Sequence, residues 1–278
     1  MFERDPFDIF YTYNMPVDFS RVDNKTIEKL NSELPDIGCT NFSILPDHIN
    51  NGNEPWEKRL WMIGRRAEQC KWGIITASVL YTFLEDLARK FSTPGLVTGH
   101  ITEEGFQKLV MAAGEEHEKG HGGPSEFNYM SDRFGREVVQ ALNAIPALWD
   151  HLSYAIAEFY QIGTDRCDIW RVVNSHKVKA NLRQLREHIR FNDGKNPYEK
   201  VLRIRNRDQH REDVSSDVYK SMFGMADANI FEKEEARVKE YLNHIGEGYK
   251  HFVKGYRIMI DQMNKDAREM KDGEIFGK

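Results

Sequence analysis

The chain has 278 residues, of which 40% are hydrophobic and 30% charged, and its formal net charge is −5. This apolar fraction is enough for a packed core and excludes wholesale disorder. No run of about 18 apolar residues occurs, so we expect no membrane partner. The first residues carry acids where a secretory signal would carry Lys or Arg, which predicts no targeting segment. The widely spaced Cys39, Cys70 and Cys167 argue against a disulfide scaffold and favour a cytoplasmic location.

The first half of the chain predicts helices after an irregular start. Residues 1–55 are acidic and rich in Pro and Asn, and we expect a loop-rich N-terminal extension there. Apolar residues at three- and four-residue steps predict long helices over about 56–91 and 130–161. Thr102 is the expected N-cap of a shorter helix over 103–118. Pro146 is expected to kink or split the 130–161 helix.

The second half continues the helical pattern. Residues 169–173 (Ile-Trp-Arg-Val-Val) are a candidate short strand, but no second strand is predicted to pair with them. Asn174 and Ser175 are expected to cap a helix over 176–190, and Pro197 suits the first turn of a helix over about 197–212. A buried stripe predicts a last long helix over 232–271. The prediction is an all-α, up-and-down helical bundle over residues 56–272.

Positive charge is concentrated in one segment, which we call the cationic strip. Residues 171–211 hold twelve Lys and Arg against four acids, a local charge of +8, so the rest of the chain carries −13. Such a strip on an anionic body could mark where a polyanion docks. The alternative interpretation is a solvated helix surface laced with salt bridges.

The strip contains the hexapeptide Arg205-Asn206-Arg207-Asp208-Gln209-His210. This R-N-x-x-x-H pattern resembles the defining motif of HEPN domains, which are all-α bundles found in toxin–antitoxin, abortive-infection and CRISPR-linked ribonucleases. We interpret the motif as the charged opening of a helix late in the chain, with one long helix after it. The resemblance implies a HEPN-like core over about 130–265 and a homodimer whose two motifs meet in one cleft. It also implies RNA as a partner, no cofactor, and a defence or toxin-like role that admits an antitoxin or regulatory protein as a further partner.

These residue types suit metal-independent RNA cleavage. His210 can move a proton to or from the 2′-OH and the leaving 5′-oxygen, and Arg205 can clamp phosphate oxygens. Asn206 is four residues before His210, so its amide could orient the imidazole or the phosphate. The expected RNA-binding cations are the following side chains of the strip: Lys177, Lys179, Arg183, Arg186, Arg203 and Arg207. The family branch silenced by nucleotidylation has Tyr two residues after the His, whereas this chain has Glu212, so the resemblance does not imply that control.

Three alternatives stay open at this stage. A non-catalytic helical module could use the strip to hold RNA or an acidic protein. The hexapeptide could be an exposed, charge-paired first turn of a helix without activity. His117, Glu118 and His121 satisfy H-E-x-x-H, the pattern of a metal-dependent hydrolase, although Gly120 and the following Gly-Gly-Pro interrupt the helix that such a site needs.

Overall fold

The computed structural model describes residues 24–37, 55–118, 123–163, 167–210 and 214–269, and every regular element within these ranges is a helix. The helices are α2 (Asn24–Glu33), α3 (Pro55–Phe91), α4 (Glu103–Glu118), α5 (Gly123–Phe159), α6 (Ile169–Val173), α7 (Arg183–Ile189), α8 (Pro197–His210), α9 (Val214–Gly224) and α10 (Phe231–Glu269). The predicted all-α bundle is therefore confirmed. None of the described helices combines the length and the apolar character needed to cross a bilayer.

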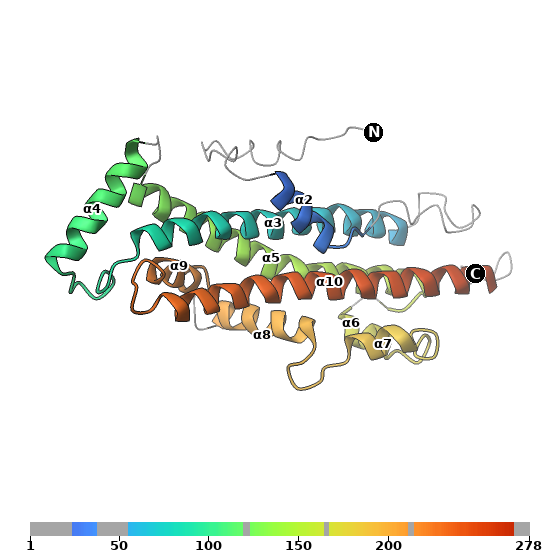
Figure 1. The fold of residues 1–278 in the computed structure, drawn as a ribbon. Coiled ribbons are helices and arrows are strands. Elements are labelled where there is room, and N and C mark those ends of the chain that lie inside the picture. Colours follow the sequence, from blue (N-terminus) through green and yellow to red (C-terminus); the bar gives the residue numbers. More distant parts are fainter. Residues whose placement is uncertain (1–23, 38–54, 119–122, 164–166, 211–213, 270–278) are drawn as a thin grey trace.

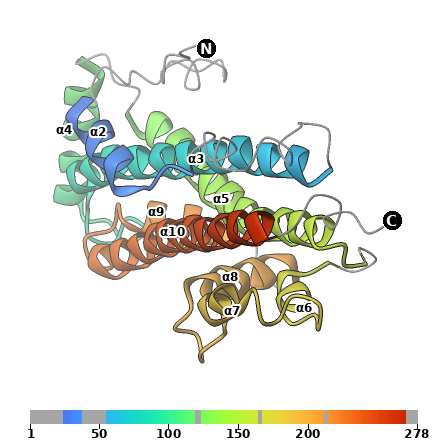
Figure 2. The same cartoon turned by 90° about the vertical axis from the view of Figure 1, so that its right-hand side faces the viewer.

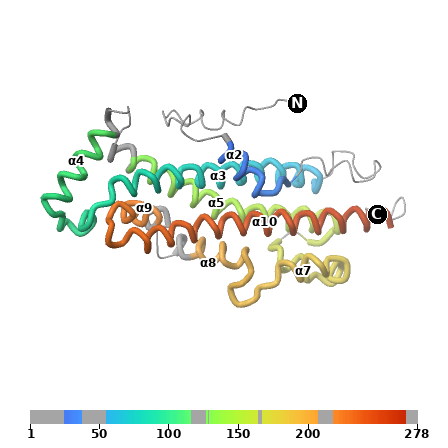
Figure 3. Tube along the Cα trace, in the orientation of Figure 1, coloured from blue at the N-terminus to red at the C-terminus, as the bar shows by residue number. Residues whose placement is uncertain are grey.

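Three long helices, α3, α5 and α10, form the body of the molecule (Figure 1). The central one is α5, which contacts α3, α4, α6, α8, α9 and α10. The chain runs along α3 in one direction and returns along α5 in the other (Figure 3). At the end where they join, α4 projects away from the bundle.

The cationic strip falls on the short helices of one layer. In both cartoon views α6, α7 and α8 lie on the far side of α5 and α10 from α3 (Figure 2). α8 packs against both α5 and α10, α6 contacts α5, and α7 contacts α10. The fold therefore presents residues 171–210 as one side of the bundle.

Aromatic side chains and glycines make the packing of this layer close. Trp149 of α5 is fully buried and meets Phe252 of α10 edge to face, with ring centroids 5.2 Å apart. A Cβ at Gly248 of α10 would lie 2.6 Å from Cγ2 of Val201 in α8. Only glycine lets the two helices approach this closely. Three further aromatic residues of α10, Tyr241, Tyr249 and Tyr256, are buried in the same core.

Four local predictions need correction. Residues 169–173 form helix α6 instead of a strand, because Asp168 caps its start by accepting a hydrogen bond from the Arg171 backbone N–H at 2.9 Å. The helix predicted over 176–190 begins at Arg183, after turns over 176–182. α5 starts at Gly123, before the predicted residue 130, and Pro146 does not split it. α2 lies within the segment expected to be loop-rich.

The predicted cap of α4 is confirmed. The Thr102 hydroxyl accepts a hydrogen bond from the Gly105 backbone N–H at 3.1 Å, which is the N-cap arrangement. Both boundaries of α4 agree with the sequence-based prediction, and those of α3, α8 and α10 agree within two residues.

Candidate functional site

The candidate site is built on α8, whose start is fixed by one buried side chain. Asn196 accepts a hydrogen bond from the Tyr198 backbone N–H at 2.8 Å, as an N-cap does. Its amide nitrogen donates to the carbonyls of His188 and Arg190, at 3.3 and 3.1 Å. Asn196 thus joins the end of α7 to the start of α8 and sets the direction in which α8 leaves.

The hexapeptide occupies the C-terminal end of α8. The expectation that it opens a helix is wrong, because α8 starts at Pro197 and its last residue is His210. The physical reason is the Asn196–Pro197 start signal, which places residues 205–210 in the last turns. Asn206 is exposed. The side chains of Arg207 and His210 lie outside the described residues, as does Glu212.

Arg205 lies against the bundle. It is half-buried, and its Nε is buried without a hydrogen-bond partner among the described residues. The pKa of Asp150 on α5 is raised, mainly because the carboxyl group is partly buried. The positive charge of Arg205 opposes this rise, and the negative charge of Asp168 adds to it. Asp150 is therefore an electrostatic neighbour of Arg205. No sequence pattern indicated it, because the two residues are 55 positions apart and meet only through helix packing.

The helix geometry separates the two expected catalytic side chains within one chain. Residues 205 and 210 lie about 140° apart around a continuous helix. Asn206 and position 210 share one face, as predicted from their spacing. Because Arg205 and position 210 face different directions, a single α8 does not bring them into one site by its backbone alone.

Half of the expected RNA-binding cations already have partners within the chain. Arg183 forms an ion pair with Glu187 at 2.9 Å, and Arg203 forms one with Glu199 at 2.5 Å. The Lys177 ammonium donates to the Gln161 carbonyl at 2.8 Å. Arg183 and Glu187 are both exposed, and such a surface ion pair contributes only about 0–1 kcal/mol, so a phosphate can displace it at small cost. Glu199 is buried, so the pair that it forms with Arg203 is harder to displace.

The remaining cations differ in access. Lys179 is exposed and forms no ion pair with any described residue. Arg186 is half-buried, and its Nη1 is buried without a partner in the described part of the chain. Lys179 is therefore better placed than Arg186 for a polyanion.

Two histidines pack against each other where α7 meets α10. The rings of His188 (α7) and His251 (α10) stack with centroids 3.9 Å apart and an interplanar angle of 22°. His188 donates to the His251 carbonyl at 2.9 Å. Burial lowers the pKa of His251 to about 3, and the charges of His188 and Lys254 add to this; burial also lowers the pKa of His188. At neutral pH the pair is uncharged and serves packing.

The H-E-x-x-H pattern extends past the described part of α4. α4 ends at Glu118, and His121 lies outside the described residues, as do the side chains of His117 and Glu118. Among the described side chains, no three His, Cys, Asp or Glu residues gather as metal ligands do.

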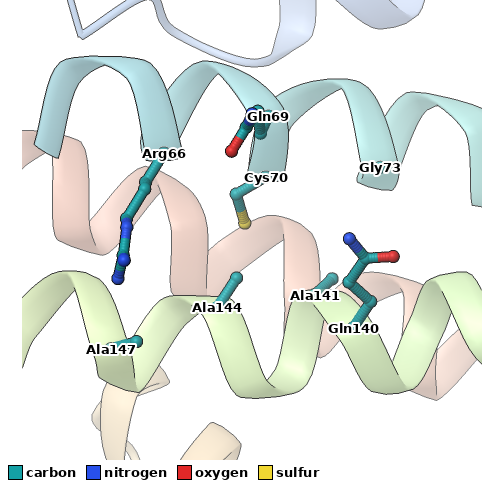
Figure 4. A pocket seen from close by; sticks show the side chains of 8 residues that line it. All are labelled: Arg66, Gln69, Cys70, Gly73, Gln140, Ala141, Ala144 and Ala147. Atoms are coloured by element: carbon teal, nitrogen blue, oxygen red, sulfur yellow. The ribbon is translucent and has the colours of Figure 1, made fainter. Parts of the chain in front are cut away.

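A cavity of about 320 Å³ lies between α3 and α5, away from the strip (Figure 4). Small residues line its α5 side, where the Cys70 sulfur points toward Ala144 and Arg66 reaches toward Ala147. Burial raises the pKa of the Cys70 thiol to about 12. A thiol that stays protonated is a poor nucleophile, so this cavity lacks an activated group.

No protein-family model, no curated protein and no solved structure matches the chain.

Proposed function

We propose that the protein is a metal-independent endoribonuclease of the HEPN type, with a defence or toxin-like role. The observation that carries the proposal is the Arg205-Asn206…His210 hexapeptide at the end of α8, within an all-α bundle and inside the +8 strip. The all-α architecture and the exposure of Asn206 support it.

In the proposed reaction the 2′-oxygen of a nucleotide attacks the adjacent phosphorus and the bond from phosphorus to the 5′-oxygen breaks. The products are a 2′,3′-cyclic phosphate and a free 5′-hydroxyl. His210 accepts the proton of the 2′-OH, and the leaving 5′-oxygen takes up a proton from a second acid. The guanidinium of Arg205 stabilises the charge that builds on the phosphate.

We propose that the active form is a homodimer, because one α8 presents residues 205 and 210 on different faces. Two antiparallel α8 helices across a two-fold axis can supply Arg205 from one copy and His210 from the other. Each such site then holds one Arg205 and one His210, and the second acid that gives a proton to the leaving 5′-oxygen is water.

Metal independence is the first test. Cleavage of a single-stranded RNA should continue in excess EDTA and should yield cyclic-phosphate ends, because His and Arg take the roles that a metal ion would fill. Loss of cleavage on chelation, with recovery on adding zinc, would refute the proposal and favour the site at His117.

Mixing inactive variants tests the dimer. After Arg205→Ala and His210→Ala chains are mixed and reassociated, one intact site forms in each mixed dimer, so about a quarter of the wild-type rate should return. The control mixes the Arg205→Ala chain with a chain carrying both substitutions, which offers no intact pair. Equal rates in the two mixtures would exclude a site shared between copies.

A second candidate function is a non-catalytic RNA-binding module. The partial burial of Arg205 beside Asp150 favours it, because a guanidinium held in the bundle has less freedom to reach a phosphate. RNA binding without cleavage by the wild-type protein would support this candidate.

A further inference from the structure

A cavity of about 470 Å³ opens on the strip side of the bundle, close to Arg205. We call it the Trp170 pocket. It lies between α5, α6, the segment that links α7 to α8, and α8, and these residues line it: Asp150, Asp168, Ile169, Trp170, Arg190, Phe191, Tyr198 and Leu202. Its volume is in the range of about 300–1,000 Å³ that small-molecule sites occupy.

Two large aromatic rings at this pocket are exposed. Trp170 of α6 is 48% exposed, and Phe191, directly after α7, is 53% exposed. They come from different elements, and both line the cavity. Exposed rings cost hydrophobic free energy unless something covers them. The flat faces of a heterocyclic base are suited to cover such rings by stacking.

Apolar side chains form the inner wall. Ile169 and Tyr198 are buried, and Leu202 is partly buried against the core. The Tyr198 ring lies 6.2 Å from the Phe191 ring and 5.3 Å from the buried Trp149 ring, both between centroids. This wall is backed by the packed core, so the pocket keeps its shape without a ligand.

The polar groups of the pocket fit the edge of a base and its phosphate. Asp168 already accepts the Arg171 backbone N–H and pairs with the Arg171 side chain. Within the described ranges, no residue donates a hydrogen bond to the Asp150 carboxylate, which can accept only. An amino group of a base is the matching donor. Arg190 is exposed at the same pocket and can hold a phosphate.

The surroundings distinguish a nucleic acid from an apolar partner. Four of the eight lining residues belong to the +8 strip, and Trp170 and Leu202 directly precede Arg171 and Arg203 in the chain. Sites for single-stranded nucleic acids combine cations that follow the backbone with aromatic rings on which bases stack. An apolar peptide would cover the rings but would offer no negative charge to the cations of the strip.

We propose that the Trp170 pocket binds a base of single-stranded RNA by stacking on Trp170 and Phe191, with the base edge toward Asp150. This inference rests on the proposed function, because it assigns a binding subsite to the RNA substrate. It places an unpaired nucleotide beside Arg205, the expected phosphate clamp.

The test measures binding of a fully 2′-O-methylated, single-stranded RNA, which cannot be cleaved because its 2′-oxygen carries no proton. Trp170→Ala and Phe191→Ala should each weaken binding about 5- to 150-fold, the range for losing one base–aromatic stack. Trp170→Phe should retain most of the affinity, since it keeps a ring. The matched control is Trp61→Ala on α3, which removes a ring that is 52% exposed, and it should bind like wild type.

Binding of inorganic polyphosphate distinguishes the contribution of base stacking from that of charge. It is a polyanion without bases, so Trp170→Ala should bind it as wild type does, whereas Lys179→Glu should weaken the binding of both probes. Equal losses for RNA and polyphosphate in Trp170→Ala would overturn the inference, because they would point to a general disturbance of the strip. Wild-type RNA affinity in both Trp170→Ala and Phe191→Ala would also overturn it.

The failure of this inference is distinct from the failure of the proposed function. RNA binding that depends on Trp170, without any cleavage of ordinary RNA, keeps the pocket and refutes the ribonuclease. Cleavage that does not depend on Trp170 or Phe191 keeps the ribonuclease and refutes the pocket. A wild-type protein that neither binds nor cleaves RNA refutes both.

Discussion

Replacing Gly248 by Ala tests how α8 is held. Gly248 lies on the buried side of α10, where an added Cβ would be 2.6 Å from Cγ2 of Val201 in α8 and 3.3 Å from Cδ1 of Ile145 in α5. Ordinary contacts of this kind lie at about 3.5–4.0 Å. Because Val201 and Ile145 are both fully buried, neither can swing into solvent, and α8 must shift outward.

The expected loss of stability in Gly248→Ala is obtained by comparison with a second glycine of the same helix. Gly246 is two residues away on α10, and a Cβ there meets nothing within 4 Å. Gly246→Ala should stabilise the protein by about 0.5–1 kcal/mol, the helix-propensity gain. Gly248→Ala receives the same gain but adds an overpacking cost of about 1–3 kcal/mol. The two variants should therefore differ by about 1–3 kcal/mol, with Gly248→Ala the less stable.

The assay is urea unfolding of the two variants and wild type, followed by circular dichroism and compared through their midpoints. RNA cleavage should also fall in Gly248→Ala, since the shift of α8 moves the hexapeptide. If Gly248→Ala is as stable as Gly246→Ala, then α8 does not pack against α10 as described, and the placement of the motif is wrong.

Three further predictions concern the same layer. The pKa of His251 is lowered to about 3 while its ordinary value is about 6.5, so the unfolded chain binds a proton first as the pH falls. Stability should therefore be full above about pH 6.5 and should drop by about 1.4 kcal/mol for each pH unit below it. His251→Phe should reduce this dependence on pH, as measured by urea unfolding at pH 7 and pH 5. Asn196→Ala removes a cap and two hydrogen bonds to the carbonyls of His188 and Arg190, and it should cost about 2–4 kcal/mol of unfolding free energy. Asn192→Ala in the same loop should cost less than about 0.5 kcal/mol. Equal unfolding midpoints for the two variants would show that Asn196 does not join α7 to α8. The third variant reverses the charge of four side chains of the strip: Lys177, Lys179, Arg183 and Arg186. For binding of single-stranded RNA, the slope of log K (the association constant) against log salt should become shallower by about 0.7 for each phosphate that the protein no longer neutralises. An unchanged slope would identify the strip as a solvated surface.

The long helices could be predicted because each carries a continuous apolar stripe, although the sequence placed the start of α5 at residue 130 and not at Gly123. Pro55, Thr102 and Pro197 mark the starts of α3, α4 and α8, and α10 follows one buried face for 39 residues. The β-branched residues at 172–173 favoured a strand, but the Asp168 cap and the burial of Val172 and Val173 decide for a helix. Intrinsic propensity is weak against a cap and a packed face.

The site could be predicted only in part, because it depends on contacts between distant segments. The hexapeptide is local and visible in the sequence. The neighbourhood of Arg205 and Asp150 comes from α8 packing on α5, and no periodicity encodes that pairing. The Trp170 pocket could not be predicted for the same reason, because Trp170 precedes α7 in the chain and Phe191 follows it.

Cleavage of a single-stranded RNA in EDTA by wild type, His210→Ala and Arg205→Ala decides whether the hexapeptide is a ribonuclease site. We expect cleavage by wild type and a loss of about 10²–10⁴-fold in His210→Ala, the usual cost of removing a positioned proton-transfer group. We also expect a similar loss in Arg205→Ala and little rescue in Arg205→Lys, since an ammonium cannot reproduce two parallel hydrogen bonds. Helical content should be unchanged in His210→Ala. Wild-type rates in both alanine variants would contradict the account and place any chemistry outside the hexapeptide.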